Sequence, residues 1–272
     1  MKTKKHFKLT SETKINWNGV TLYRIEAIID FYIIKKGDKG GWVEKKDNLS
    51  GNAWVYGNAR VYGNARVYGN ALVSGDARVS GDARVYGDAL VSGDARVYGN
   101  AWVSGDVRVY GNARVYGDAL VSGNAWVSGD ARVYGDALVS GDARVYGDAR
   151  VYGNARVSGD VRVYGNARVY GDALVSGNAR VYGNALVSGD ALVYGDEWKK
   201  SPLQIQGTRS FINECKKGYL RIGCIELSFE AWRERAEEIG KKNGYSKLEI
   251  KEYQLYIDLA IELSKLTGNK TE

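Results

Sequence analysis

The sequence predicts an all-β solenoid, and three observations support that fold class. The first is the phrase Gly-[Asn/Asp]-Ala-x-Val-[Tyr/Ser], which runs from Gly51 to Tyr194 in 24 copies without an insertion or deletion. The second is the alternation of apolar and variable residues in each copy, which is typical of a strand with one buried face. The third is the Gly-Asn or Gly-Asp pair, because both residue types tolerate the backbone of a tight bend.

Each hexad is therefore expected to form one short strand and one corner. Such a strand cannot bury its face alone, so successive coils must stack along an axis. Three strands per triangular coil give an 18-residue turn, and the 24 hexads then form eight coils. With neighbouring strands about 4.8 Å apart, the rod is roughly 38 Å long.

Two features of the repeat agree with an 18-residue turn. Val107 and Val161, which replace the repeat Ala, are separated by three whole turns and so fall on one face. The variable position is Arg in seven successive turns and Leu in the eighth, although Arg fills 14 of the 24 variable positions and chance can produce such a row. This arginine row consists of Arg60, Arg78, Arg96, Arg114, Arg132, Arg150 and Arg168.

The segments that flank the repeat are predicted to cap it. Asn18-Gly19 between two apolar runs predicts a hairpin. The domains are then an N-terminal β cap (1–50), the solenoid (51–195) and a C-terminal α+β cap (196–272). A cap protects the open end of a stack of strands from end-to-end polymerisation.

Two helices are predicted in the C-terminal cap, after a strand over residues 219–227. Ser228 is placed to cap the first helix, and Ser246 with Glu249 forms a capping box for the second. Both helices carry apolar stripes, which are expected to form the core of the cap against the last coils. The outward residues that they are expected to cover are Leu174, Leu186 and Leu192.

Charge and composition narrow the function classes. Of the net charge of +7, most comes from residues 1–50, with 11 Lys and Arg against 6 Asp and Glu, whereas the repeat carries 14 Arg against 13 Asp. This near balance argues against general polyanion binding. Without a signal peptide or any run near the ~20 apolar residues of a membrane span, we expect a cytoplasmic chain with no membrane partner. Cys215 and Cys224 are expected to be reduced thiols.

The fixed offsets of the aliphatic residue, Gly, Asn/Asp and Ala across residues 51–195 resemble the hexapeptide-repeat left-handed β-helix. More narrowly, LYRIEAIIDF, KGDKGGWVEKKDNLSGNAWVYGNARVYG and RIGCIELSFEAWRERAEEIGKKNGYSKLEIKEY are similar to the YdcK-like β-solenoid proteins of bacterial prophages. The resemblance implies a left-handed solenoid and a viral context, without a settled activity.

Acyltransferase is the enzyme activity suggested by the left-handed β-helix resemblance, and it typically needs a histidine as general base. The single histidine, His6, falls in a charged leader where a solvated side chain is expected. Asn replaces Asp freely at the corners, so ladders of side-chain hydrogen bonds, with some Asp paired to Arg, are favoured over calcium sites. The sequence therefore predicts no enzyme, no metal and no cofactor.

The arginine row is interleaved with tyrosines at the same period. Arg and Tyr are enriched in interface hot spots and also contact phosphates and bases. One interpretation is a partner-binding face, and the other is a solvated ladder in which guanidinium groups stack on Tyr rings and pair with corner Asp. The tyrosines are Tyr62, Tyr98, Tyr116, Tyr134, Tyr152 and Tyr170.

A second candidate surface is the mid-rod patch, formed by Trp102, Leu120, Trp126 and Leu138 around one edge. Exposed apolar clusters usually contact another chain, so the patch predicts a homodimer. The leading hypothesis is a non-enzymatic, prophage-type protein that presents a rigid surface to a host protein or complex, with bacterial defence systems such as CRISPR effectors among the targets to test. Nucleic-acid binding along the Arg/Tyr face and hexapeptide acyl transfer are the alternatives.

Overall fold

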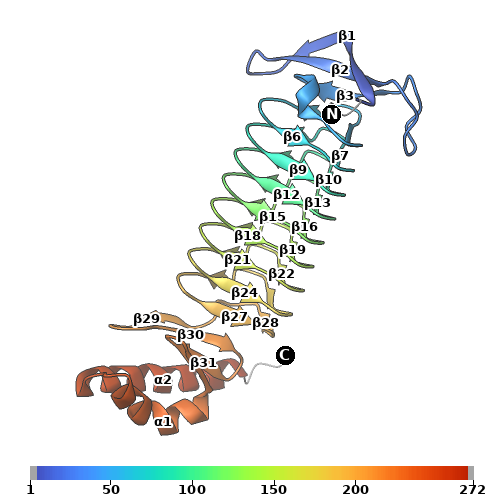
Figure 1. Ribbon diagram of the computed structural model, residues 1–272. Coiled ribbons are helices and arrows are strands. Elements are labelled where there is room, and N and C mark those ends of the chain that lie inside the picture. The colour runs from blue at the N-terminus through green and yellow to red at the C-terminus, as the bar shows by residue number, and fades with distance from the viewer. Residues whose placement is uncertain (1–4, 269–272) are drawn as a thin grey trace.

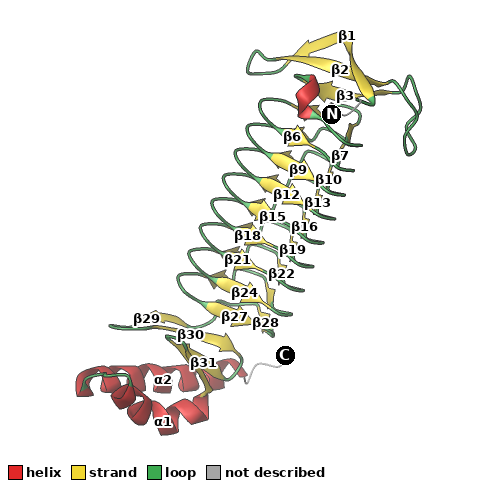
Figure 2. Ribbon diagram, viewed as in Figure 1, coloured by secondary structure: helices red, strands yellow, loops and turns green. Residues whose placement is uncertain are grey.

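The computed structural model describes residues 5–268, which form a three-sided rod with a cap at each end (Figure 1). Successive hexads contribute one short strand to each of three faces in turn (Figure 2). The arginine face continues into the N-terminal cap as an 11-stranded sheet. Its strands are β1 (Phe7–Ile15), β2 (Thr21–Ala27), β3 (Lys39–Val43), β5 (Arg60–Val61), β8 (Arg78–Val79), β11 (Arg96–Val97), β14 (Arg114–Val115), β17 (Arg132–Val133), β20 (Arg150–Val151), β23 (Arg168–Val169) and β26 (Leu186–Val187).

The other two sides of the rod are parallel sheets of nine and eight strands, called here the second and third faces. The second face contains β4 (Trp54–Val55), β7 (Leu72–Val73), β10 (Leu90–Val91), β13 (Arg108–Val109), β16 (Trp126–Val127), β19 (Arg144–Val145), β22 (Arg162–Val163), β25 (Arg180–Val181) and β28 (Glu197–Trp198). The third face contains β6 (Arg66–Val67), β9 (Arg84–Tyr86), β12 (Trp102–Ser104), β15 (Leu120–Val121), β18 (Leu138–Val139), β21 (Arg156–Val157), β24 (Leu174–Ser176) and β27 (Leu192–Tyr194).

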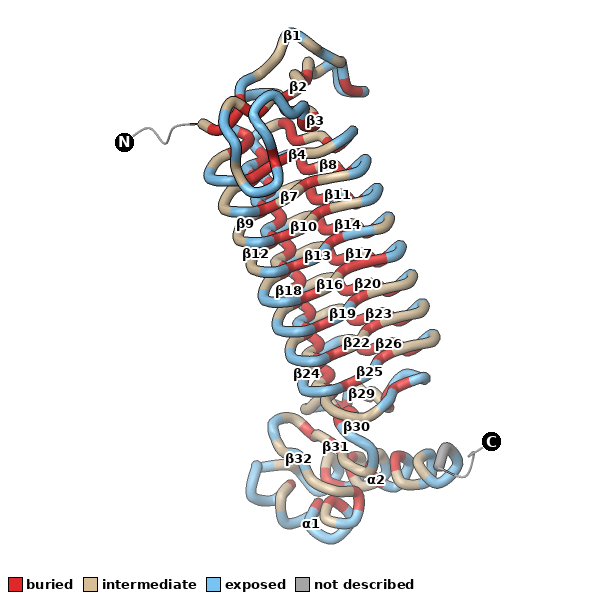
Figure 3. Tube along the Cα trace, turned by 90° about the vertical axis from the view of Figure 1, so that its right-hand side faces the viewer, coloured by how far each residue is buried: buried red, intermediate tan, exposed pale blue. Residues whose placement is uncertain are grey.

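The strand register confirms the 18-residue coil. Val97, for example, pairs in parallel with Val79 on one side and with Val115 on the other. The repeat Ala and Val residues are fully buried and form one continuous core. The trace in Figure 3 is coloured as buried in each coil of the rod. Before the first hexad, β3 and a bridge between Leu49 and Val67 already stack on the coils, and β28 continues the stack after the last hexad. The solenoid therefore has about nine turns.

The corners stack as closely as the strands do. At Gly105 the backbone is left-handed, with φ +81°, and a Cβ atom there would lie 2.7 Å from the carbonyl oxygen of Gly123 in the next coil. Beside the glycines, Asn side chains donate to the Asp one coil further on, as Asn100 does to Asp118 at 2.9 Å. Glycine is thus required by conformation and by space, and the predicted corner ladder is present.

The predicted hairpin at Asn18-Gly19 is confirmed, since β1 and β2 pair antiparallel on either side of this turn. β2 pairs antiparallel with β3, and β3 pairs parallel with β5. Between β3 and β4 the chain forms a short 3₁₀ helix, η1 (Lys46–Asn48). The N-terminal cap is therefore a direct extension of the arginine face rather than a separate layer.

The C-terminal cap is a four-stranded antiparallel sheet with two helices packed on it (Figure 1). The Ser228 side chain accepts a hydrogen bond from the Ala231 N–H, and Ser246 and Glu249 form the predicted capping box. The elements are β29 (Gln204–Gln206), β30 (Phe211–Lys216), β31 (Tyr219–Ile222), β32 (Ile225–Ser228), α1 (Phe229–Lys242) and α2 (Lys247–Gly268).

The expectation that the helices cover Leu174, Leu186 and Leu192 is wrong. Phe229, Trp232 and the apolar side of α2 pack with Ile212 and Leu220 of the cap sheet, in a cluster separate from the solenoid core. It is β30 that meets the last coil, where the Asn213 side chain donates to the Leu192 carbonyl at 2.6 Å. The cap sheet thus lies between the coils and the helices.

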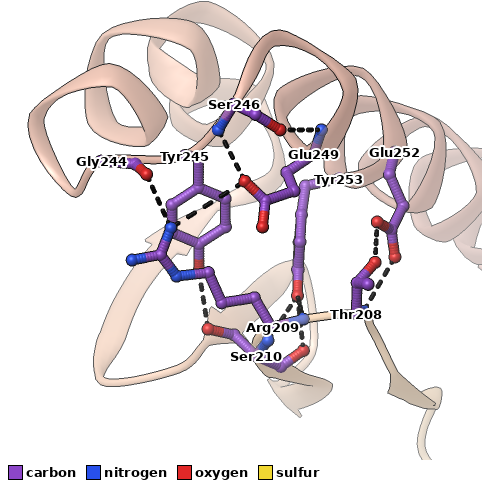
Figure 4. Close-up of polar contacts among 9 residues, drawn as sticks. All are labelled: Thr208, Arg209, Ser210, Gly244, Tyr245, Ser246, Glu249, Glu252 and Tyr253. Atoms are coloured by element: carbon purple, nitrogen blue, oxygen red, sulfur yellow. Dashed lines mark hydrogen bonds and ion pairs between the residues drawn. The ribbon is translucent and has the colours of Figure 1, made fainter.

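Polar contacts attach the loop between β29 and β30 to the connection between the helices and to α2 (Figure 4). The Arg209 guanidinium, in the loop after β29, donates to the Gly244 carbonyl at 2.7 Å, lies 4.6 Å from the Tyr245 ring centroid and is 3.9 Å from Glu249. The Tyr253 hydroxyl accepts a hydrogen bond from the Arg209 N–H at 3.0 Å. This loop therefore holds two parts of the cap in place, the connection between the helices and the first turns of α2.

Candidate interaction surface

The arginine row lies along one side of the rod. Each of its residues pairs in register with the next, from Arg60 on β5 to Arg168 on β23, and Leu186 ends the series. The row follows from strand alternation, because the Val after each Arg points into the core. The arginines of the row therefore recur along the rod at the distance between neighbouring strands, ~4.8 Å.

A ladder of tyrosine rings stands beside this row. From Tyr98 to Tyr170 consecutive rings stack with centroids 4.8–4.9 Å apart and planes within 5° of parallel. Partial burial raises the pKa of Tyr116, Tyr134 and Tyr152 above its ordinary value. Tyr62 is not part of the ladder, because Ser80 occupies the intervening coil. Stacking therefore fixes the orientation of the tyrosine rings along this edge of the arginine face.

The guanidinium groups of the row have no acidic partner among residues 5–268, since none lies within 4.0 Å of a carboxylate. The expected Arg–Asp pairs along the repeat are therefore absent from this part of the chain, where the one repeat Arg in an ion pair is Arg180, with Glu197. Among residues 5–268, the repeat arginines that stack on an aromatic ring stack on Trp and not, as expected, on Tyr. The row thus presents positive charge without a direct counter-charge.

The mid-rod patch extends over two faces. Trp102, Leu120 and Leu138 pair in successive coils of the third face, whereas Trp126 lies around the corner on the second face. Trp102 is 41% exposed and the other three are half-buried. The guanidinium carbons of Arg108 and Arg144 lie 5.0 and 4.9 Å from the Trp126 ring centroid. The structure therefore forms a row of three apolar residues and places Trp126 between arginines.

The expectation that His6 is solvated is wrong. Its ring is 5% exposed and packs between Phe7, Phe31 and Trp54, with Nε2 2.9 Å from the Ala53 carbonyl oxygen. Burial is the main cause that lowers the pKa of His6 below its ordinary value. Lys5 and His6, just before β1, contact the backbone of residues 46, 49 and 53, so this histidine is part of the junction between cap and solenoid.

The two cysteines are free thiols in different environments. Cys215 is buried and Cys224 is exposed. Burial, followed by the nearby Glu226 carboxylate, raises the pKa of Cys215 to about 12. Among residues 5–268 there is no cluster of His, Cys, Asp and Glu arranged to hold a metal ion, and no helix long and apolar enough to span a bilayer.

The arginine face continues beyond its first arginine, to residues that the predicted row did not include. Trp42 on β3 pairs with Arg60, and Arg24 on β2 pairs with Trp42. A sequence signal for this extension exists, because Trp42 precedes Arg60 by one whole turn of the repeat. Lys14 on β1 adds a further cation, with its Nζ 4.1 Å from the Trp42 ring centroid.

Fold and surface together define a β-solenoid protein made of six-residue repeats, with a continuous row of seven arginines along one face. A family model described as YdcK Beta solenoid repeat matches the chain in segments between residues 53 and 195, and the chain belongs to this family. No curated protein is significantly similar in sequence. Among solved structures, the chain is similar to an Arabidopsis UDP-N-acetylglucosamine acyltransferase, at 13% identity over 78% of each chain with a TM-score of 0.35.

Proposed function

We propose that this chain is a non-enzymatic interaction protein of the prophage type, whose arginine face docks on a protein or complex of the host cytoplasm. The observation that carries the proposal is the row of seven guanidinium groups without a carboxylate partner, held beside a stacked tyrosine ladder. A surface that is ordered before binding loses less conformational entropy on association, so many weak contacts add up. Complexes of bacterial defence, including CRISPR effectors, are the first partners to test.

The test removes charge from the centre of the arginine face. The triple variant Arg96→Ser, Arg114→Ser, Arg132→Ser is expected to lose the partner and to keep the fold, because the neighbouring Val residues that fill the core are untouched. The matched control replaces the three arginines of the third face, Arg66, Arg84 and Arg156, by Ser.

Chemical crosslinking in bacterial lysate, followed by mass spectrometry, compares these two variants with the parent chain. A partner captured by the parent and the control, and lost from the arginine-face variant, supports docking through this face. A partner retained equally by both variants shows that the row is a solvated ladder, and places the interaction in the caps or the mid-rod patch.

Nucleic acid is the second candidate partner, favoured by the unpaired guanidinium groups beside aromatic rings. For duplex DNA, each phosphate contact contributes about 0.9 to the slope of log affinity against log salt, so loss of three contacts should flatten it by about 2.7. Fluorescence anisotropy with a labelled duplex across a salt series measures the slope. An equal slope for parent and variant removes nucleic acid as the partner of this face.

Self-association is proposed at the mid-rod patch, as a twofold dimer in which the patch meets its own copy. Trp126→Arg would place a charge in that contact, and Trp102→Arg does the same at the most exposed of the four side chains. Light scattering should show a dimer for the parent chain and a monomer for both variants. A parent chain that stays monomeric at high concentration removes this dimer and leaves the patch to a foreign partner.

A further inference from the structure

Two cations lie over one indole, and a third is its neighbour on the next strand, where the arginine face enters the N-terminal cap. Arg24, Trp42 and Arg60 are neighbours on β2, β3 and β5, so their side chains share one side of the sheet. The Lys14 ammonium and the Arg24 guanidinium carbon lie 4.1 and 5.3 Å from the Trp42 ring centroid. Burial, with Arg60 and Arg24 as further causes, lowers the pKa of Lys14 to about 8.

Two hydrogen-bond donors in this cluster are unused. Trp42 Nε1 and Arg24 Nε are both buried from solvent and have no hydrogen-bond partner. Each buried donor left unsatisfied costs about 1–3 kcal/mol, and such a group in a native structure is explained by local strain, a bound water molecule or an ion.

The acids near the cluster do not supply the missing acceptor. Glu12 Oε2 is 3.9 Å from Arg24 Nε, which is too far for a hydrogen bond, and Glu12 Oε1 already accepts from Lys39. Lys14 forms no ion pair among residues 5–268, and Asp76 influences it only through the electrostatic field. Every unsatisfied group at this point is therefore a donor or a positive charge.

We propose that Lys14, Arg24, Trp42 and Arg60 form a binding site for an oxyanion. An oxyanion accepts several hydrogen bonds at once, so it can take the indole N–H and the Arg24 Nε–H while the two other cations neutralise its charge. Lys14 and Arg24 are long, partly exposed side chains that lie over the ring, so entry requires only their rotation. The site goes beyond the proposed docking role, because it can bind a free anion without a protein partner.

The test observes the proposed donor directly. The seven tryptophans give seven indole N–H signals in a ¹⁵N-correlation NMR spectrum, and the signal that disappears in Trp42→Phe belongs to Trp42. The probes are inorganic phosphate and a capped triglutamate peptide, each added at constant ionic strength with chloride as the control. Binding of phosphate would indicate that the site takes a free anion, whereas binding of the peptide would indicate that it takes an acidic group carried by a protein.

The comparison of variants decides the result. Lys14→Met keeps an aliphatic chain over the indole and removes the charge, Arg60→Met is a second variant on another strand, and Lys200→Met is the control at the opposite end of the rod. A shift of the Trp42 signal with either probe, unchanged in Lys200→Met and weakened about tenfold or more in affinity in Lys14→Met and Arg60→Met, supports the site. No shift with either probe, or equal affinity in the Met variants, overturns it.

Discussion

Replacement of a single corner glycine measures how tightly the coils are stacked. In Gly105→Ala the new Cβ atom is placed at a left-handed φ of +81° and 2.7 Å from the Gly123 carbonyl oxygen. The backbone conformation costs about 1–2 kcal/mol for a residue with a side chain. The overlap with a fixed backbone atom adds about 1–3 kcal/mol, as overpacking does elsewhere. A less flexible unfolded chain returns about 0.4–1 kcal/mol. The expected net loss is therefore about 1–4.6 kcal/mol.

Gly195→Ala is the matched control, because Gly195 has a φ of +60° and nothing within 4 Å of its added Cβ. This variant carries the conformational cost without the overlap, so it should lose only about 0–1.6 kcal/mol once the lower flexibility of its unfolded chain is subtracted. Urea unfolding, followed by circular dichroism, compares the two midpoints with that of the parent chain. Equal midpoints for the two variants would show that the contact between stacked corners has no energetic weight, which refutes the reasoning.

Three further predictions concern single side chains. At Lys14 alone, the unfolded chain holds more proton than the folded one between pH 8 and 10.5, because burial and Arg60, Arg24 and Arg78, opposed by Asp76, lower the pKa of Lys14 from 10.5 to about 8. The contribution of Lys14 to stability should therefore rise with pH across that window, and the difference in urea midpoint between the parent and Lys14→Met, measured at each pH, should report it free of the other titrating groups. His6→Ala should reduce stability by about 1–3 kcal/mol, since the Ala53 carbonyl loses its partner. The same substitution should change no acetyl transfer from acetyl-CoA, whereas activity lost on substitution would contradict a non-enzymatic role. Cys224 should react with a thiol reagent in the folded protein, and Cys215, buried and with its pKa raised to about 12, only after unfolding.

The solenoid could be predicted from the sequence because one local pattern repeats without interruption. The alternation in each hexad decides that Val97 points inward and Arg96 outward, and the register then follows from stacking like strands. The hairpin and both helix starts depend on signals only a few residues long, such as Ser246 with Glu249, and these also persist in the structure.

The contacts between distant segments could not be predicted in the same way. His6 is buried because Phe31 and Trp54 close around it, and no local pattern links these three positions. The cap helices carry the predicted apolar stripes, but the sequence does not reveal that Ile212 and Leu220, rather than the last coils, lie beneath them. An amphipathic helix specifies that it needs a partner without specifying which one.

The part of the interaction surface that lies within the repeat could be predicted from the sequence, whereas the part that lies in the N-terminal cap could not. Counting in whole turns of the repeat gives the arginine row and also separates Trp126 from Trp102, Leu120 and Leu138. Lys14 and Arg24 reach the same face through antiparallel pairing in the cap, which breaks the period. Their convergence on Trp42 required the three-dimensional structure.

The 18-residue register also limits how a gene for such a rod can change in length. Duplication or loss of the coding sequence for one whole coil would add or remove one step of every row and leave each face with its own chemistry. Loss of a single hexad, for example residues 105–110, would rotate everything downstream by one face. The arginines from Arg114 onward would then continue on a different side from Arg60 to Arg96, and the C-terminal cap would turn with them. Recombination between identical hexads changes the length of the rod by whole hexads, so the coils still stack. If every number of hexads is equally frequent, two changes in three are not a multiple of three hexads and divide the arginine row between two faces.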